Sequence, residues 1–463
     1  MDKLRFVVLG DSHFCTKEIR GRYEKNCSLA QTPDHVRYAD MVDEVLAPML
    51  EKVKALKPEF VISTGDFVEG GMAGDRDNTY REMKEGWEFM QTLDCPFFIA
   101  KGTHEGSGEG NPGAEAYREI VMAGLREQTG LSLDKEYFRY DKGDCSFFLL
   151  DYLDYVPGRE QDQWLVAGLK DASENKRRIF IAAHPPLYNW GRHFFNEPEF
   201  INRIIELCSE YNVDAYFCGH THNQCASFHE TGGGRGFLQL MGSSVGYPEM
   251  GVIALDNFHS LAEFSGNDKY LWGIHEDSAP GFYLVEIDGE AMKIQWISSK
   301  GDEASFSLEE RRGVPTAVVP PEYKKYEQVL SGSGVNQIKG AWLHIYGLYR
   351  DEDSSEVLFN GISLGSLPSN CSYAARRYFT LNDEALNAVR AENSIEIKLP
   401  AKGDFVVGSA SLELVLWDGR VIRSEVAKEL FVGGARWKEF PQPRLVAKAR
   451  NGEKVNFSLS FKQ

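Results

Sequence analysis

Residues 5–13 read Arg-Phe-Val-Val-Leu-Gly-Asp-Ser-His, an apolar run of strand length that ends in a glycine, a carboxylate and an imidazole. Four further apolar runs end in the same way, in side chains able to bind a metal or move a proton. They are followed by Gly65-Asp66, by Gly102-Thr103-His104-Glu105, by His184 and by Gly219-His220-Thr221-His222. Loops at the carboxyl ends of strands in α/β sheets converge on one crevice, so we expect these five segments to meet in space.

The first 300 or so residues alternate between strand and helix patterns. Short apolar runs predict buried strands at 5–9, 60–63, 97–100, 147–150, 179–182 and 215–217. Helical periodicity between several of these runs predicts helices, for example at 41–56 and 199–211. Alternation of this kind is typical of a layered α/β domain with a covered sheet.

The pattern changes near residue 311. Residues 311–325 read Arg-Arg-Gly-Val-Pro-Thr-Ala-Val-Val-Pro-Pro-Glu-Tyr-Lys-Lys, which predicts a linker. Beyond it, apolar and polar residues alternate with period two, Asn360-Gly361 and Asp418-Gly419 suit type I′ hairpin turns, and helix signal is confined to about 383–390. We therefore predict a first domain over 1–310, a linker over 311–325 and an all-β, jelly-roll-like sandwich over 326–463.

Composition excludes several classes of protein. The chain has 463 residues and a net charge of −18, so its surface should repel nucleic acid, and no nucleic-acid partner is expected. No apolar stretch reaches membrane-spanning length, and the first apolar run is too short for a signal peptide. The eight cysteines are scattered without a C-x-x-C pair, which indicates reduced thiols. The expected location is the cytoplasm.

The residue types at the strand ends suit two adjacent divalent cations. Imidazole and carboxylate together favour Mn, Fe, Zn or Co over Ca, which prefers oxygen ligands. Asp66 is the best candidate for a carboxylate shared by two metals. Metals roughly 3.5–4 Å apart can hold a phosphoryl oxygen and lower the pKa of a bridging water, which gives a hydroxide nucleophile. The candidate ligands are Asp11, His13, Asp66, His184, His220 and His222.

The ordered set Asp-x-His, Gly-Asp, Gly-x-His-Glu, His and Gly-His-x-His resembles the motifs of the calcineurin-like metallophosphoesterases. The resemblance implies a four-layer α/β/β/α sandwich of two sheets flanked by helices. It assigns one metal to Asp11, His13, Asp66 and His222, and the other to Asp66, His184 and His220. It makes His104 the general acid or transition-state stabiliser, oriented by a carboxylate such as Glu105.

The sequence departs from the family pattern at two points. Thr103 stands where the third motif usually has an asparagine that ligates the second metal, so a weaker ligand or a phosphate contact is expected there. The second motif, Gly65-Asp66-Phe67-Val68-Glu69, contains no tyrosine, and the first contains His13. Both features look unlike the purple acid phosphatases.

Two further pairs of residues are weaker candidates. Asn111 and Glu109 lie in a glycine-rich loop and could replace the missing asparagine ligand, although solvation of the loop is the more usual role. Arg192 and His193 follow the fourth motif and could contact substrate, although a surface role is more usual.

Two functions remain open at this point. The first is hydrolysis of a phosphomonoester or phosphodiester by a metal-bridging hydroxide, with a small-molecule phosphate ester as substrate. The alternative is a catalytically weak member of the family that serves as a binding or scaffold protein, as the retromer subunit with this fold does. Retention of the histidines and aspartates favours the enzyme, and Thr103 alone favours the scaffold. Nothing in the sequence identifies a partner protein.

Overall fold

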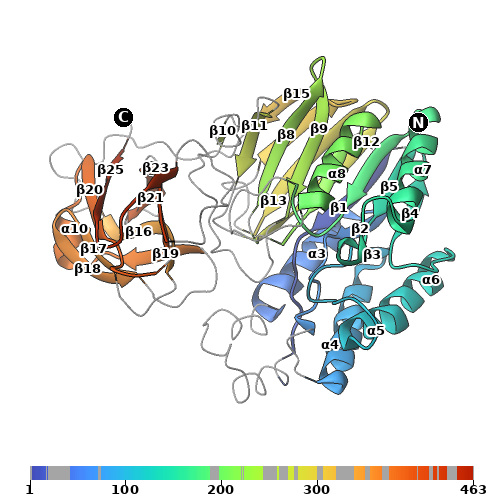
Figure 1. Cartoon of the computed structure of the whole chain (residues 1–463), viewed down its shortest axis with the longest axis horizontal. Helices are drawn as coiled ribbons and strands as arrows, with labels where there is room; N and C mark the ends of the chain where they lie inside the picture. The colour runs from blue at the N-terminus through green and yellow to red at the C-terminus, as the bar shows by residue number, and fades with distance from the viewer. Residues whose placement is uncertain are drawn as a thin grey trace. The chain divides into compact units, whose positions relative to one another are not determined.

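The chain forms two compact units (Figure 1), of which the first ends at Pro321 and the second takes up Glu322–Gln463 with parts of the preceding sequence. The computed structural model describes residues 3–16, 18, 42–70, 75–187, 198–220, 222, 224–242, 258–259, 270–275, 280–299, 306–319, 338–349, 355–367, 375–403, 405–416, 421–424, 427–434 and 446–461. Within these ranges no helix has the length and hydropathy needed to cross a membrane.

A seven-stranded sheet in the first unit has the order β15-β14-β13-β12-β1-β2-β3. The parallel strands β1, β2 and β3 are three of the apolar runs predicted from the sequence, and β12 pairs with β1 antiparallel. The strands are β1 (Leu4–Leu9), β2 (Phe60–Ser63), β3 (Phe97–Ile99), β12 (Gly281–Asp288), β13 (Ala291–Ser298), β14 (Phe306–Arg311) and β15 (Val314–Val319).

An eight-stranded sheet has the order β10-β11-β8-β9-β7-β6-β5-β4. Its parallel strands β5, β6 and β7 are the other three predicted runs. The strands are β4 (Phe138–Lys142), β5 (Cys145–Leu149), β6 (Arg178–Ala182), β7 (Ala215–Cys218), β8 (Cys225–Gly232), β9 (Arg235–Met241), β10 (Phe258–His259) and β11 (Tyr270–His275).

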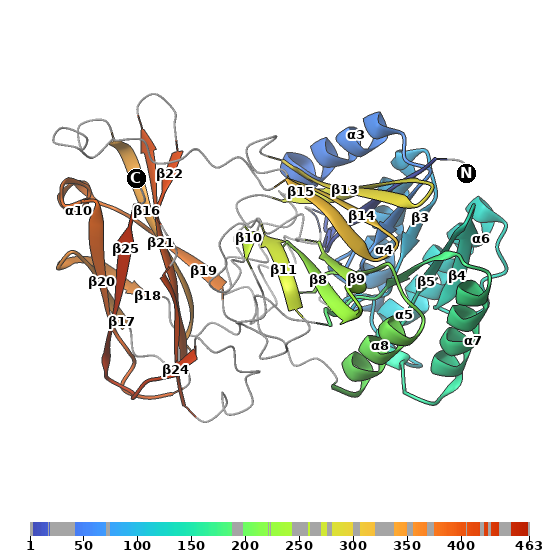
Figure 2. The same ribbon diagram turned by 90° about the horizontal axis from the view of Figure 1, so that it is seen from above.

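Helices cover the outer faces of the two sheets. α3 lies against the seven-stranded sheet, whereas α7 and α8 lie against the eight-stranded sheet (Figure 2). The first unit is therefore the four-layer sandwich that the resemblance implied. The helices are α3 (Ala47–Leu56), α4 (Arg76–Met90), α5 (Pro112–Ala116), α6 (Ala123–Thr129), α7 (Glu160–Glu174) and α8 (Pro198–Glu210).

Phenylalanine rings fill the space between the two sheets. Phe6 on β1 contacts Phe147 at a centroid distance of 5.1 Å and both Phe180 and Phe217 at 5.9 Å. Phe60 on β2 contacts Phe147 at 5.0 Å. These interlocking rings hold the two sheets face to face, so the ends of β1 and β2 face the ends of β6 and β7.

The predicted linker over 311–325 is wrong in its first half. Val314–Val319 forms β15, which pairs with β14 antiparallel, and the first unit continues to Pro321 rather than ending at 310. Arg312 and Gly313 make the tight turn between these strands, with φ values of 44° and 76°. Pro315 suggested a linker, but β15 lies at the edge of the sheet, where a strand tolerates proline.

A buried ionic cluster joins the two sheets at the guanidinium of Arg178, which is 1% exposed. The Arg178 Nη1 donates to Asp214 Oδ1 at 2.8 Å and to Glu310 Oε1 at 2.5 Å. Removing the arginine leaves two buried carboxylates without their counter-charge. We expect Arg178→Met to lower the free energy of unfolding by about 3–5 kcal/mol in denaturant titrations.

An exposed ion pair offers the matched control for this variant. Lys3 Nζ lies 3.0 Å from Asp288 Oδ2, and both side chains are largely exposed. Lys3→Met should change the free energy of unfolding by less than about 1 kcal/mol. A loss in Arg178→Met no larger than that in Lys3→Met would contradict a stabilising role for the cluster.

The second unit is the predicted all-β sandwich. A six-stranded sheet has the order β19-β16-β21-β23-β24, with β22 paired to β21, and a four-stranded sheet has the order β18-β17-β20-β25. One buried core takes Leu343 and Leu412 from the first of these sheets and Ile395 and Ile397 from the second. The strands are β16 (Ile338–Tyr349), β17 (Ser355–Phe359), β18 (Ile362–Leu367), β19 (Ala375–Thr380), β20 (Glu392–Lys398), β21 (Phe405–Leu416), β22 (Val421–Arg423), β23 (Ala427–Gly433), β24 (Val446–Lys448) and β25 (Lys454–Ser460).

Local features of the second unit also follow the sequence. Asn360 and Gly361 join β17 to β18 with φ values of 49° and 86°, as a type I′ turn requires. The one predicted helix is α10 (Asp383–Asn387). The Asp418-Gly419 turn lies outside the described residues.

Candidate metal centre

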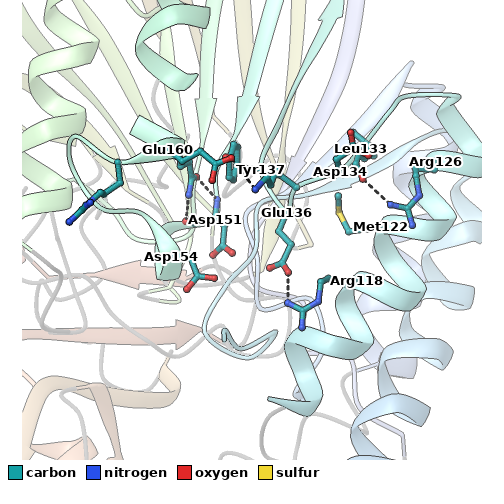
Figure 3. Close-up of a pocket in the computed structure, with 13 residues that line it drawn as sticks. Arg118, Met122, Arg126, Leu133, Asp134, Glu136, Tyr137, Asp151, Asp154 and Glu160 are labelled. Carbon is teal, nitrogen blue, oxygen red and sulfur yellow. Dashed lines mark hydrogen bonds and ion pairs between the residues drawn. The ribbon is translucent and has the colours of Figure 1, made fainter. Parts of the chain in front are cut away.

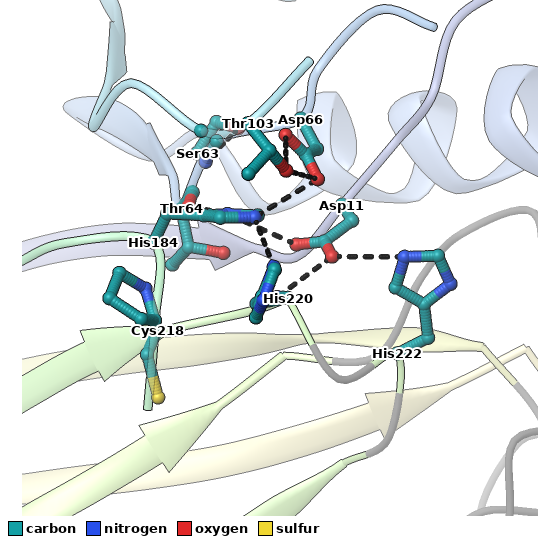
Figure 4. A network of polar contacts seen from close by, with 12 residues as sticks. Asp11, Ser63, Thr64, Asp66, Thr103, His184, Cys218, His220 and His222 are labelled. Atoms are coloured by element: carbon teal, nitrogen blue, oxygen red, sulfur yellow. Dashed lines mark hydrogen bonds and ion pairs between the residues drawn. The ribbon is translucent and has the colours of Figure 1, made fainter. Parts of the chain in front are cut away.

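All six predicted ligands lie just beyond the carboxyl ends of parallel strands. Asp11 and His13 follow β1, Asp66 follows β2, His184 follows β6, and His220 and His222 follow β7. Both sheets therefore contribute. Figure 4 shows Asp11 facing His220 and His222, and Asp66 facing Thr103 and His184.

The ligand atoms gather in two neighbouring groups. Asp11, His13 and His222 form one, in which His222 Nε2 lies 3.0 Å from His13 Nε2 and 3.3 Å from Asp11 Oδ2. Asp66, His184 and His220 form the other, in which His184 Nε2 lies 3.0 Å from Asp66 Oδ2 and 2.9 Å from His220 Nδ1. Asp66 also groups with His13, so its carboxylate can serve both sites.

The chemistry of these groups fits two divalent cations. Ring nitrogens of different histidines point at one another within each group, a crowding that a shared cation relieves. Asp11 Oδ1 is fully buried and has no hydrogen-bond partner among the described residues. Burial raises the pKa of Asp11 to about 8, because His184 offsets only part of the cost of burying the carboxylate, and its ionised form therefore needs further positive charge. A bound cation would supply that charge, and mixed imidazole and carboxylate ligands suit Mn, Fe, Zn or Co.

Four of the six ligands have a left-handed backbone conformation. The φ values are 42° at His13, 46° at Asp66, 69° at His220 and 58° at His222. Such conformations cost of order 1–3 kcal/mol each for residues with a side chain, and they cluster at functional sites. These left-handed residues turn the chain sharply after each strand and direct the ligand side chains into the site.

Glycines let the two carboxylates approach the backbone of neighbouring loops. A Cβ atom on Gly219 would lie 2.0 Å from Asp11 Oδ1, and one on Gly102 would lie 2.4 Å from Asp66 Oδ1. Any larger residue at either position would displace a ligand, which explains the glycines in these motifs.

Glu105 has a different role from the one expected. Its carboxylate is fully buried and accepts hydrogen bonds from the backbone N–H groups of Asp66 at 2.9 Å, Phe67 at 2.8 Å and Gly102 at 2.7 Å. It thus ties the loop after β2 to the loop after β3 and fixes the backbone of Asp66. It does not hydrogen-bond to the ring of His104.

The carboxylate beside His104 is Glu69, which the sequence analysis missed as a site residue. His104 Nδ1 lies 3.0 Å from the Glu69 backbone oxygen and 3.6 Å from Glu69 Oε2, and His104 Nε2 is 4.0 Å from Asp66 Oδ2. Burial would lower the pKa of His104, but the negative charges of Asp66 and Glu69 outweigh it and raise the pKa to about 9. These carboxylates favour the imidazolium form of His104, whose Nε2 faces Asp66.

Glu69 also holds a metal ligand. Its Oε2 lies 2.7 Å from His13 Nδ1, and both side chains are buried. This contact directs His13 Nε2 toward the first ligand group, and a carboxylate that holds a ligating histidine in this way raises the basicity of the ligand. A lone acidic residue after the apolar pair Phe67-Val68 is the signal that could have identified it.

We expect Glu69→Gln to weaken the affinity of the first site for Mn²⁺ by roughly 10- to 100-fold, because glutamine keeps the length of the side chain but removes its charge. Calorimetric titration of metal-free protein would measure the change. Glu88→Gln on α4, where the side chain is exposed, is the matched control. Equal affinities in the two variants would show that Glu69 does not support the ligand.

Thr103 contacts the shared carboxylate. Its exposed side chain donates through Oγ1 to Asp66, with distances of 3.2 Å to Oδ1 and 3.0 Å to Oδ2. The other weak candidates do not join the site. Asn111 caps α5 by accepting from the backbone of Gly113 and Ala114, and Glu109 is exposed. Arg192 and His193 lie outside the described residues.

A third acidic group lies in a separate pocket (Figure 3), formed by Glu136, Asp151 and Asp154. The buried ammonium of Lys101 contacts both Glu136 and Asp151, the latter at 2.5 Å. Arg118 also pairs with Glu136 at 2.7 Å, so two of the three carboxylates already have cationic partners and we assign no metal to this group.

Parts of the chain are similar to known proteins. Residues 4–224 match the family described as calcineurin-like phosphoesterase. Tartrate-resistant acid phosphatase type 5 of Homo sapiens is 26% identical over 292 residues, which cover 57% of this chain and 82% of that protein. Purple acid phosphatase 15 of Arabidopsis thaliana is 28% identical over 151 residues, 31% of this chain and 28% of that protein. A solved dimetal phosphatase from Danio rerio is 13% identical with a TM-score of 0.44, covering 69% of this chain and 99% of that one.

These relatives bear on the expected difference between this chain and the purple acid phosphatases. The sequence is similar to a purple acid phosphatase over a third of its length, so the expected difference from that group is not general. That expectation rests on the site, where the segment Asp66-Phe67-Val68-Glu69 contains no tyrosine and the first motif contains His13.

Proposed function

Since this chain belongs to the calcineurin-like phosphoesterases through residues 4–224, we propose that it hydrolyses small phosphate esters with two divalent cations held on either side of Asp66. The observation that carries the proposal is the pair of buried ligand groups that share this carboxylate. Two cations so placed supply Lewis acidity toward a phosphoryl oxygen and activate a water molecule as the nucleophile.

The residues divide the work between the two cations. Asp11, His13 and His222 would hold one, His184 and His220 would hold the other, and Asp66 would bind both. Glu105 and the two glycines at positions 102 and 219 keep the carboxylates in place. Five of the six ligand side chains are buried and His220 is half-buried. The site is therefore preorganised for a charged transition state.

His104 supplies the proton that the reaction needs. Its Nδ1 hydrogen-bonds to the backbone oxygen of Glu69, so its Nε2 remains available to the substrate. A protonated imidazole at this position can donate to the leaving-group oxygen as the ester bond breaks. Part of the ring is exposed, as contact with a substrate requires.

Hydrolysis of aryl phosphate mono- and diesters, measured side by side on metal-reconstituted protein, tests the proposal. We expect metal-dependent turnover of at least one of the two esters. The ratio of the kcat/KM values for the monoester and the diester would assign the ester class. The alternative of a binding or scaffold protein predicts a different result, which is bound metal without hydrolysis of either ester. The six predicted ligands together with His104 support the enzyme.

A further inference from the structure

Tyr152 occupies a rigid position at the carboxyl end of β5, beside the candidate metal centre. It begins the short turn Tyr152–Asp154, whose preceding residue, Asp151, accepts a hydrogen bond from the backbone of Leu153 at 3.2 Å. The Gln161 side chain accepts a hydrogen bond from the backbone N–H of Asp151 at 3.0 Å and donates one to the backbone oxygen of Asp151 at 2.9 Å. Lys101 binds the Asp151 carboxylate. The start of this turn is therefore fixed before any substrate arrives.

The side chain of Tyr152 contacts His184 and Thr103, two residues that in turn contact Asp66. Its ring packs against the ring of His184 at a centroid distance of 5.8 Å, with an interplanar angle of 32°. Burial raises the pKa of its hydroxyl, and a contact with Thr103 opposes this shift. Thr103 in turn lies 3.0 Å from Asp66 Oδ2. The phenol is thus at the edge of the second ligand group, where Thr103 is exposed and Tyr152 is half-buried.

We propose that Tyr152 is a substrate-binding residue whose hydroxyl donates to a phosphoryl oxygen held at the His184–His220 side of the centre. The inference rests on the proposed function. A phosphate ester presents anionic oxygens that accept hydrogen bonds, and a phenolic hydroxyl can donate to one such oxygen. The hydroxyl proton of Thr103 is already donated to Asp66, so the tyrosine supplies the donor.

Phosphate binding by the metal-loaded protein tests this role without any turnover. We expect Tyr152→Phe to raise the Kd for inorganic phosphate roughly 10-fold or more, as the loss of a hydrogen bond to a charged group implies. The kcat/KM for an aryl phosphate should fall by a similar factor. Affinity for Mn²⁺ should stay unchanged, because phenylalanine keeps the ring that packs on His184.

A matched control and a second variant sharpen the test. Tyr137→Phe removes a hydroxyl in the pocket of Figure 3, where the ring packs on Trp164, and it should leave phosphate binding unchanged. Thr103→Val should weaken phosphate binding less than Tyr152→Phe does, because Thr103 contacts Tyr152 rather than the phosphate. The double variant should lose less than the product of the two single losses if Thr103 acts through Tyr152.

The outcomes separate this inference from the proposed function. Phosphate affinity in Tyr152→Phe equal to that of the native protein would overturn the inference, as would a loss explained by weaker Mn²⁺ binding. Native protein that binds phosphate through Tyr152 but hydrolyses no ester would support the inference and refute the proposed function. Native protein that hydrolyses esters with no contribution from Tyr152 would support the proposed function and refute the inference.

Discussion

A chelator should abolish the phosphoesterase activity of this protein, and Mn²⁺ or a similar ion should restore it. The expectation follows from the six ligands, which supply imidazole and carboxylate to two sites and leave Asp11 Oδ1 buried without a hydrogen-bond partner among the described residues. The cations would activate water and compensate the charge that develops on the phosphoryl oxygens. Hydrolysis of an aryl phosphate, measured with the metal content of the same samples, would test the expectation.

Asp66→Asn addresses the same point at one residue. The shared carboxylate serves both sites, and losing only an outer partner of a ligand already costs 10- to 100-fold in metal affinity or activity. We therefore expect a loss larger than about 100-fold in both. Asp154→Asn, in the third acidic group, is the control and should leave metal content unchanged. Full activity in metal-free protein, or in Asp66→Asn, would refute the role of the centre.

His104→Ala should lower kcat by roughly 10²–10⁴ on an ester with a poor leaving group, because the departing oxygen then receives no proton. The loss should shrink on an activated aryl ester, whose leaving group needs little protonation. Metal content should remain that of the native protein, since the two assigned sites do not depend on His104. Steady-state kinetics on the two esters provide the comparison.

The ratio between the two esters is the informative measurement for His104. An equal loss on both would mean that this residue stabilises charge or positions substrate rather than donating a proton. A loss of metal from the variant would instead make His104 a ligand, as its grouping with His13 and Asp66 allows.

The ligands could be predicted from the sequence because each one is encoded locally. A buried strand such as β1 or β2 is visible as an apolar run, and the residue that ends it is read directly from the chain. The fold class adds that parallel strands end at the same edge of a sheet. Neither step requires knowing which strands are neighbours, so Asp11, Asp66 and His184 could be grouped without the structure.

The supporting residues could not be predicted because they depend on the direction of side chains. Glu105 and Glu69 are both acidic and lie within three residues of His104 or Asp66 in the sequence. The left-handed turn at Asp66 and the fold of the loop after β3 decide that Glu105 turns to the backbone and Glu69 to the two histidines. Tyr152 could not be predicted as a site residue, because its position depends on packing against His184.

Pairing between distant strands was the other limit. The sequence predicts β1 as a strand but not its antiparallel neighbour, Gly281–Asp288, because register depends on contacts far apart in the chain. The predicted boundary at 310 was wrong for the same reason. Pro315 disfavours a central strand but not an edge strand, and the position of a strand within its sheet is not a local property.

β1 lies between β2 and β12, and this position constrains how the protein can be made. A ribosome that has released 222 residues has delivered every metal ligand, yet β1 still lacks its partner, residues 281–288. Until that strand emerges, β1 is an open sheet edge able to pair with other chains. Completion of the sheet, and of a stable site for the cations, must therefore wait until late in translation. Slowing elongation beyond residue 222 should favour aggregation of nascent chains over metal loading.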